Sequence, residues 1–414
     1  MSSASDSFSA SDSVRVSHAI QPPAADRRAA LDRMRRWLAT HQDDVLQILT
    51  DVASHASIVG EILSSIKVLD GAVGEIATTR PPALERMAVF MPSNMILYSY
   101  VLYLAIPSLF VDRVDFRPSS HVTGQLARLH AVLAPVHELP VRLQRVSQSD
   151  FIEQAVRGAN LVVFTGTYAN AEEVRRQLRK DQLYVFFGQG VNPFVVSEKA
   201  NVDLATSDLI RIRMYNSGQD CLGPDAIFVH EDVAEIFLAT LIAKLRKATF
   251  GSRKDAKADY CPLYYSSTLD LISKYLIANA AFIKAGGTID YSQQKLEPTV
   301  LCSTLPTRPN IVEFFAPVFN VITYESDAAL AGELNKPFYR ERALGASVYG
   351  NDTLAAVLRA NHTVSVDTTL LEVENGNAAF GGYGPMANYI HYRGQRHIEP
   401  ILISDVVARF WEGA

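Results

Sequence analysis

The sequence predicts an α/β protein of two domains, the first built around a doubly wound parallel sheet. At 414 residues the chain is longer than a single core usually serves, which favours two domains of roughly 200 residues each. Its 48% hydrophobic and 20% charged residues can supply both cores. Between about residues 84 and 180, short apolar runs alternate with segments of helical apolar spacing, which is typical of parallel strands joined by helices.

The first part of the chain predicts a tail and then helices. Residues 1–23 are rich in Ser, Ala and Asp, without a basic region or an apolar run, so we expect a disordered tail and no targeting peptide. Apolar residues recur at helical spacing from Asp26 to about Lys67, which predicts two or three helices. The most apolar run, from Met95 to Val111, contains Pro107 and lies between two strand-like segments. A buried helix is therefore favoured over a membrane span.

Three apolar runs, each ending in a polar loop, predict parallel strands, and helical segments at 124–134 and 170–180 follow the second and third. Ligands of such sheets bind at the carboxyl ends of the strands. Three loops therefore become candidate binding loops, and they are Pro92–Asn94, Arg117–Ser119 and Thr165–Thr167.

Charge and cysteine usage limit the partners. A net charge of -5 and a pI near 6.1 give no electrostatic case for nucleic acid or an anionic membrane, so a small-molecule substrate is favoured. Cys221, Cys261 and Cys302 are too widely spaced for a disulfide framework or a zinc motif. We therefore expect no metal site and a reducing compartment, the cytoplasm.

Six motifs follow one another along the chain, and they are MPSN, FRPS, VVFTGT, NSGQDCLGPDAIFVH, VEFFAPV and FGGYG. Together they resemble the landmarks of the aldehyde dehydrogenase superfamily over residues 91–384, and the interval of 117 - 94 = 23 positions between Asn94 and Arg117 agrees with that family. The resemblance implies a Rossmann-type cofactor domain, at 24–190, and an α/β catalytic domain with a smaller sheet, at 191–384. Residues 385–414 are expected to form a C-terminal tail that could add a strand to a neighbouring subunit of a homo-oligomer, most simply a dimer.

The resemblance also implies the chemistry. In this family a cysteine thiolate attacks an aldehyde or activated acyl carbon, and a side-chain amide steadies the resulting oxyanion before hydride passes to nicotinamide. Cys221 matches the nucleophile and Asn94 the amide. A lone cysteine is more often an inert buried side chain, but the flanking motifs favour catalysis. Gly218, before the cysteine, would let the backbone approach the cofactor and the sulfur closely.

Cofactor contacts follow from the same matches. Arg117 matches a lysine that binds the adenosine ribose, the loop Thr165, Gly166 and Thr167 lies near the pyrophosphate and nicotinamide, and Glu313 with Phe315 matches the pair beside the nicotinamide ribose. For Glu313 a solvated loop charge is the plain alternative, and for Phe315 it is core packing.

The residues after Arg117 bear on the choice of cofactor. Ser119 and Ser120 follow it, and NAD-preferring relatives often carry an acidic residue at the position of Ser120. Without that repulsion Arg117 can pair with a 2′-phosphate, so we expect NADP, with NAD as the alternative.

One departure from the family changes the expected outcome. Phe187, or Phe186 if Gln189 is an insertion, stands where hydrolytic members have a water-activating glutamate, and phenylalanine cannot take a proton. We therefore expect chemistry that joins an aldehyde to an acyl thioester, in either direction, with CoA or a carrier thiol as partner. Ser93, Phe186 and Phe187 would line a moderately apolar pocket.

Two alternatives stay open. The first is a conventional aldehyde-to-carboxylate dehydrogenase in which Glu372 or Glu374 replaces the base, although a solvated loop is the favoured interpretation of both residues. The second is a non-catalytic relative, against which the retention of Cys221, Asn94 and Glu313 argues.

Overall fold

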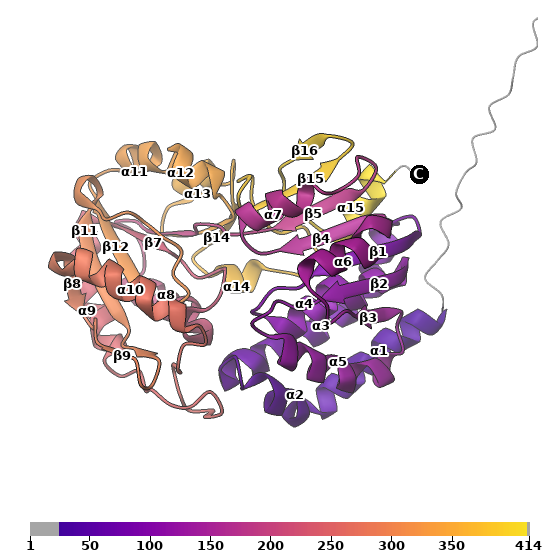
Figure 1. The fold of residues 1–414 in the computed structure, drawn as a ribbon. Helices are drawn as coiled ribbons and strands as arrows, with labels where there is room; N and C mark the ends of the chain where they lie inside the picture. Colours follow the sequence, from indigo (N-terminus) through magenta and orange to yellow (C-terminus); the bar gives the residue numbers. More distant parts are fainter. Residues whose placement is uncertain (1–24, 412–414) are drawn as a thin grey trace, which may run out of the picture.

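The computed structural model describes residues 25–411, so the predicted disordered tail at 1–23 lies outside the described residues. Two α/β units stand side by side, each around a seven-stranded sheet (Figure 1). The first sheet has the order β16-β15-β5-β4-β1-β2-β3 and the second β14-β13-β6-β7-β12-β11-β8. The expectation that the second sheet is the smaller one was therefore wrong.

The first sheet follows the predicted alternation of strands and helices. Strands β1 to β5 are parallel, and the central strand β4 is buried along almost its whole length, as expected for a strand covered on both faces. Its strands are β1 Leu84–Phe90, β2 Val111–Arg117, β3 Val141–Leu143, β4 Leu161–Thr165, β5 Leu183–Phe187, β15 Asn388–Tyr392 and β16 Gln395–His397. Its helices are α1 Ala25–Thr40, α2 Gln42–Leu49, α3 His55–Thr79, α4 Ile96–Tyr100, α5 Thr123–His137, α6 Gln148–Gln154, α7 Tyr168–Arg175 and α15 Ile403–Phe410.

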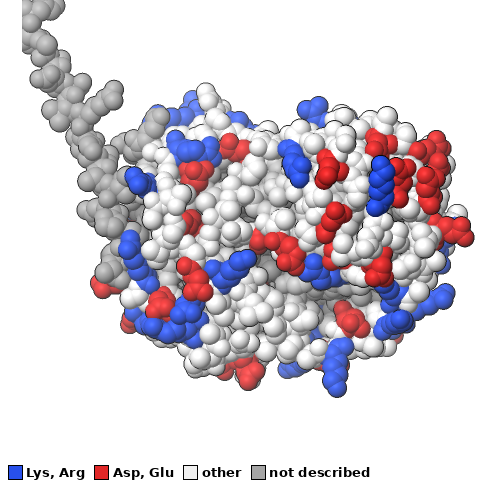
Figure 2. Space-filling model, turned by 180° about the vertical axis from the view of Figure 1, so that it is seen from behind, with Lys and Arg blue, Asp and Glu red and all other residues white. Residues whose placement is uncertain are grey.

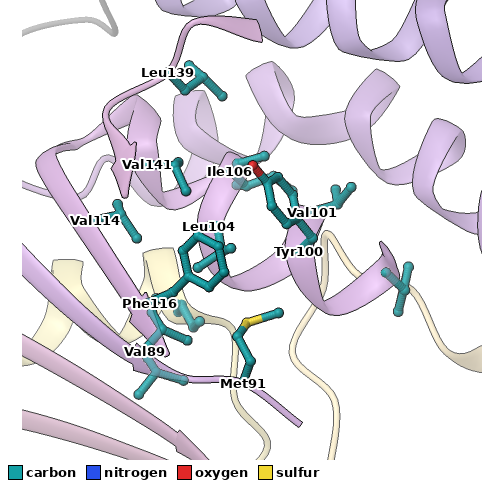
Figure 3. Packing of buried hydrophobic residues seen from close by; sticks show 14 of the residues in the cluster. Val89, Met91, Tyr100, Val101, Leu104, Ile106, Val114, Phe116, Leu139 and Val141 are labelled. Carbon is teal, nitrogen blue, oxygen red and sulfur yellow. The ribbon is translucent and has the colours of Figure 1, made fainter. Parts of the chain in front are cut away.

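The apolar run from Met95 is a buried helical segment, as predicted. After α4 it continues as a π-helical turn at Val101–Ala105 and a 3-10 turn at Pro107–Leu109. Tyr100 and Leu104 face the sheet residues Val89 and Phe116 in the core (Figure 3). Among residues 25–411, none of the helices has the length and the apolar character that crossing a membrane requires.

The second unit carries mostly short strands. Its strands are β6 Pro193–Val196, β7 Ala226–His230, β8 Ile283–Ala285, β11 Thr299–Thr304, β12 Val318–Tyr324, β13 Gly345–Tyr349 and β14 Thr363–Val366, with a separate hairpin of β9 Ile289–Asp290 and β10 Lys295–Leu296. Its helices are α8 Val202–Met214, α9 Glu231–Leu245, α10 Ser266–Ala278, α11 Asp327–Leu334, α12 Pro337–Glu341, α13 Asp352–Leu358 and α14 Leu370–Val373.

Of the predicted C-terminal tail at 385–414, the described residues 385–411 are not a free tail, which corrects a second expectation. β15 pairs antiparallel with β5, so the chain returns to the first unit after completing the second sheet (Figure 1). Ile401 bridges to Phe380 and Ile403 begins α15. The run that was expected to extend a neighbour's sheet is therefore used within its own chain.

The surface carries charges of both signs. On the face seen from behind, basic and acidic residues are intermixed (Figure 2). This distribution fits the small negative net charge of -5 and a small-molecule substrate better than a polyanionic partner.

Candidate active site

One cavity of about 710 Å³ lies where the carboxyl ends of the first sheet meet two loops of the second unit. The loops that follow β1, β2 and β4 enter it from the first unit, and the loops that precede β7 and β12 enter it from the second. The cavity brings together all the residues that the sequence predicts to be catalytic or to bind the cofactor. They are Asn94, Arg117, Ser119, Ser120, Thr165, Gly166, Thr167, Cys221, Glu313 and Phe315.

Cys221 lies half-buried in the loop between α8 and β7. Asn192 fixes this loop by donating a hydrogen bond from Nδ2 to the Cys221 carbonyl, at 2.7 Å. Burial raises the pKa of the Cys221 thiol well above its ordinary value, and the charges of Asp220 and Glu313 raise it further. The thiol is therefore protonated at neutral pH in this state, and a base must remove its proton before it can attack.

The backbone before Cys221 is strained. Asn216, Ser217 and Gly218 have φ angles of 47°, 57° and 81°, a left-handed run that only the glycine adopts without cost. A Cβ on Gly218 would lie 2.4 Å from the carbonyl carbon of Ala316. The glycine thus serves close packing against the loop that carries Glu313 and Phe315, which is a different neighbour from the one that the sequence suggested.

Asn94 follows β1 at a sharp turn. The next residue, Met95, has a φ of 49° and precedes α4, so the chain reverses at the rim of the cavity. Among residues 25–411, no hydrogen bond is formed by the Asn94 side chain. Its amide is therefore available to a ligand oxygen.

Glu313 is a half-buried carboxylate with one oxygen in use. Gln189 donates to its Oε2, and within the described chain Oε1 is buried without a hydrogen-bond partner. Burial raises the pKa of Glu313 to about 8, and the neighbouring charge of Asp225 adds to this. A buried acceptor without a partner is costly, and two ribose hydroxyls would satisfy it. The residue therefore fits the predicted role, and a solvated loop charge does not describe it.

Arg213 fixes the loop that carries Glu313. Its guanidinium is fully buried, donates to the carbonyls of Phe314, Ala316 and Val318, and lies 3.5 Å from the carboxylate of Asp225. The pattern of the sequence did not reveal this residue, because an arginine on a helix is usually exposed.

Arg117 and the loop after β4 line the part of the cavity where the sequence predicts the cofactor. Arg117 donates from Nε to the Val146 carbonyl at 3.0 Å, and burial lowers its pKa. Thr165 donates from Oγ1 to the Phe90 carbonyl, and Thr167 caps α7 by accepting from the Asn170 amide. Gly166 has a φ of 147°, which lets the chain turn between them. Both threonine hydroxyls therefore shape the loop.

The two adjacent phenylalanines have different surroundings. Phe187 lines the cavity, and its ring stacks on that of Tyr103 with centroids 5.2 Å apart. Phe186 is fully buried on the other face of β5 and packs against Tyr389. Ser93 and Phe187 thus line the pocket as predicted, but Phe186 does not.

The two candidate bases also differ. Glu372 is exposed and pairs with Arg211, as a solvated loop residue would. Glu374 follows α14, which lies between the two units (Figure 1), and it lines the cavity with Cys221. Tyr98 donates from its hydroxyl to both carboxylate oxygens of Glu374, at 2.7 and 2.8 Å. For Glu374 the favoured interpretation as a solvated loop was wrong.

The charge of Glu374 affects the thiol of Cys221. Burial raises the pKa of Glu374, and the charge of Glu374 contributes to the raised pKa of Cys221. Tyr103 also lines the cavity. Burial raises the pKa of its hydroxyl, and the charges of Cys221 and Glu374 raise that pKa further. One signal in the sequence could have indicated this arrangement, namely the tyrosines at 98 and 103 in a mostly apolar segment.

Both the sequence and the fold of this chain are similar to those of known proteins. Residues 147–385 match the family described as "Aldehyde dehydrogenase family". The 4,4′-diaponeurosporen-aldehyde dehydrogenase of Staphylococcus aureus is 24% identical over 396 residues, which cover 86% of this chain and 83% of that protein. A putative succinate-semialdehyde dehydrogenase [NADP(+)] of Mycolicibacterium smegmatis is 27% identical over 383 residues, 83% of this chain and 72% of that protein.

Solved structures share the fold. Succinic semialdehyde dehydrogenase from Streptococcus pyogenes, in complex with NADP+, superposes with a TM-score of 0.79 at 16% identity and covers 91% of this chain and 90% of its own. The glyceraldehyde-3-phosphate dehydrogenase of Methanocaldococcus jannaschii, complexed with NADP, has a TM-score of 0.74 at 20% identity and covers 92% and 89%.

Proposed function

This chain belongs to the aldehyde dehydrogenase family, and from that premise we propose that it oxidises an aldehyde with NADP through a covalent adduct on Cys221. Oxidation of aldehydes is the activity of the family as a whole. The single observation that carries the finer proposal is that Cys221, Asn94 and Glu313 line one cavity. A scaffold without catalytic function would need no such combination of nucleophile, amide and buried acceptor.

The first step is addition of the sulfur to the aldehyde. The Cys221 thiolate forms a bond to the carbonyl carbon, and the carbonyl electrons move to oxygen, where the Asn94 amide donates a hydrogen bond to the new oxyanion. Because the thiol of Cys221 has a raised pKa, its proton must first pass to a neighbouring carboxylate or to water. The buried carboxyls of Asp220, Glu313 and Glu374 all lie near enough to raise that pKa.

When bound, a nicotinamide dinucleotide would supply a hydride acceptor, so that loss of hydride from the adduct would leave a thioester on Cys221. Glu313 would hold the nicotinamide ribose through its unpartnered oxygen, with Phe315 beside it. Arg117 is the only lysine or arginine among the described residues that line the cavity. Beside Ser119 and Ser120 it would pair with a 2′-phosphate, which supports NADP, with NAD as the weaker alternative.

We propose that the thioester is then hydrolysed with Glu374 as the base. Its carboxylate takes a proton from a water molecule as the water oxygen attacks the thioester carbon, and the sulfur of Cys221 leaves as thiolate. Tyr98 supports this role because its hydrogen bonds fix the carboxylate in position. The raised pKa of Glu374 brings its basicity closer to the range useful for general-base catalysis.

A second candidate function rests on Phe187. The resemblance to the family implies that Phe187, or Phe186 if Gln189 is an insertion, stands where hydrolytic members have a water-activating glutamate. Phe187 stacks on Tyr103 in the cavity. Acyl transfer from Cys221 to CoA or to a carrier thiol, or reduction of such a thioester in the reverse direction, would need no base at that position.

One assay separates the two routes. Purified enzyme with NADP and an aldehyde is supplied with CoA or left without a thiol, and the product and NADPH are both measured. Hydrolysis by Glu374 predicts free carboxylic acid at full rate without thiol, whereas strict dependence on thiol would favour acyl transfer. Mass spectrometry of quenched enzyme should show an acyl group on Cys221 in either case, and its absence would overturn the covalent mechanism itself.

A further inference from the structure

The helical segment that follows Asn94 also lines the cavity. One part of the cavity is lined by Glu75 and by residues within 98–110, 371–380 and 401–404. From Tyr98 to Pro107 the lining extends over nine residues, a helical rise of about 13 Å. The space is therefore elongated and not a compact pocket around the sulfur.

Most of the side chains that line this part are apolar, although Ser99 and Ser404 also line it. Tyr98, Leu102 and Ile106 are spaced four residues apart and so share one face of the helical segment. Apolar side chains from the end of the second unit and the start of α15 also line the cavity. They are Leu371, Phe380, Ile401, Leu402 and Ile403.

The charges in this part are all acidic. Glu374 and Glu75 line it, and burial raises the pKa of both. Glu75 is held by Ser404 and Asn377, at 2.6 and 2.9 Å. Among the described residues, no lysine or arginine lines this part of the cavity, because Arg117 lies in the part where the cofactor is predicted. The charge of Lys67 lowers the pKa of Glu374, but the Lys67 side chain is exposed.

We propose that the substrate is a neutral aldehyde with a long apolar chain, and not a semialdehyde that ends in a carboxylate. An anionic end would be buried between two carboxyl groups without a cation, which is strongly unfavourable. An alkyl or polyene chain would instead exchange water for apolar side chains along the helix. This inference rests on the proposed function, and it chooses between the aldehydes named for two relatives, diaponeurosporen aldehyde and succinate semialdehyde.

The test is a chain-length series. We expect kcat/KM with NADP to rise from butanal through hexanal and octanal to decanal, by up to about fourfold for each methylene that is fully buried. Succinate semialdehyde should be used more poorly than butanal. A flat series, or a preference for succinate semialdehyde, would overturn the substrate class.

A variant tests the lining directly. Leu102→Lys places a cation in this mostly apolar part of the cavity, so it should lower kcat/KM for decanal by at least about tenfold. The ratio of kcat/KM for succinate semialdehyde to kcat/KM for decanal should therefore rise. Leu271→Lys is the matched control, because Leu271 is 50% exposed on α10 and does not line the cavity. Unchanged selectivity in a folded Leu102→Lys enzyme would contradict the proposal.

A binding readout keeps the test independent of turnover and of the folding of the variant. Unreactive amides of the same chain lengths are added to the wild-type protein without cofactor, and its thermal unfolding is followed. Decanamide should raise Tm more than butanamide at equal concentration, and succinamate should not raise it. If no aldehyde of any length is oxidised, the proposed function fails; if aldehydes are oxidised without the expected preference, only the substrate class fails.

Discussion

Gln189 donates a hydrogen bond from Nε2 to Oε2 of Glu313, at 2.5 Å, and so holds the one buried carboxylate that would bind a ribose. Gln189→Ala removes this contact and frees the carboxylate to rotate away from the cavity. We expect KM for NADP to rise by about tenfold, since the loss of a hydrogen bond to a buried polar group costs about 1–3 kcal/mol, while kcat changes little. Steady-state kinetics with varied NADP measure this.

Gln177→Ala is the control for that experiment. Gln177 is exposed after α7, and its amide only contacts a backbone carbonyl, so KM for NADP should stay at the wild-type value. An unchanged KM in Gln189→Ala would mean that the Gln189 contact does not position Glu313.

Glu374→Gln removes the proposed base but keeps the side-chain shape and an acceptor for Tyr98. We expect a burst of about one NADPH per active site followed by a steady rate reduced by about a hundredfold or more, because only the hydrolytic step loses its base. Stopped-flow absorbance of NADPH measures both phases. Glu372→Gln, two residues away and exposed, should keep the wild-type steady rate; hydrolysis at full rate in Glu374→Gln would exclude the role.

Arg117→Ala tests the choice of cofactor. The guanidinium is the cation available to a 2′-phosphate, so its loss should raise KM for NADP by about a hundredfold and leave KM for NAD within about threefold. The comparison of the two cofactors in one variant is internally controlled. A wild-type enzyme that prefers NAD, or a variant that loses both cofactors equally, would contradict the assignment.

The binding loops could be predicted because their evidence is local. Each follows a short apolar run, and a parallel sheet brings the carboxyl ends of its strands together whatever the details of packing. Asn94, Arg117 and Thr165 thus meet in the cavity although 71 positions separate the first from the last, by 165 - 94.

The failures depend on contacts that are distant in sequence. The burial of Glu374 depends on Tyr98, 276 positions away, and nothing near Glu374 in the sequence indicates it. Phe186 and Phe187 were not distinguished because adjacent strand residues face opposite sides, so an uncertainty of one residue exchanges cavity and core. The short outer strands β8 and β14 carry too few apolar residues for the sequence to predict them, so the second sheet was expected to be smaller than seven strands.

Alkylation of Cys221 should be slow at neutral pH. The thiolate is the reactive form, and burial with Asp220 and Glu313 nearby raises the thiol pKa well above its ordinary value. In the absence of cofactor, the rate of reaction with iodoacetamide should therefore rise by about tenfold for each pH unit through the neutral range. Peptide mapping follows Cys221, with Cys221→Ser to define the background. A rate that levels off below about pH 7 would show that the site lowers the pKa instead.

Glu61 makes stability depend on pH. It is buried, accepts a hydrogen bond from the Tyr98 amide, and its pKa is raised from 4.5 to about 7, chiefly by burial. A raised pKa in the folded state means that its contribution is fully present below the ordinary value and is lost as pH rises through about 7. Glu61→Gln should therefore increase stability at about pH 8, by up to about 3 kcal/mol, and should add nothing at about pH 4.

Thermal or urea unfolding across that pH range measures the effect. Glu235→Gln, an exposed residue on α9, should parallel the wild-type curve. A Glu61→Gln protein whose stability falls with rising pH as steeply as that of the wild type would show that Glu61 is not the titrating group.

The return of the chain to its first sheet has a consequence for biosynthesis. While the protein emerges from the ribosome, the edge of β5 beside Phe187 has no partner until the entire second sheet has been translated, because β15 follows β14 in the chain. An unpaired edge is a place where nascent chains associate wrongly. We therefore expect that the nascent chain depends most on chaperones before β15 has been translated.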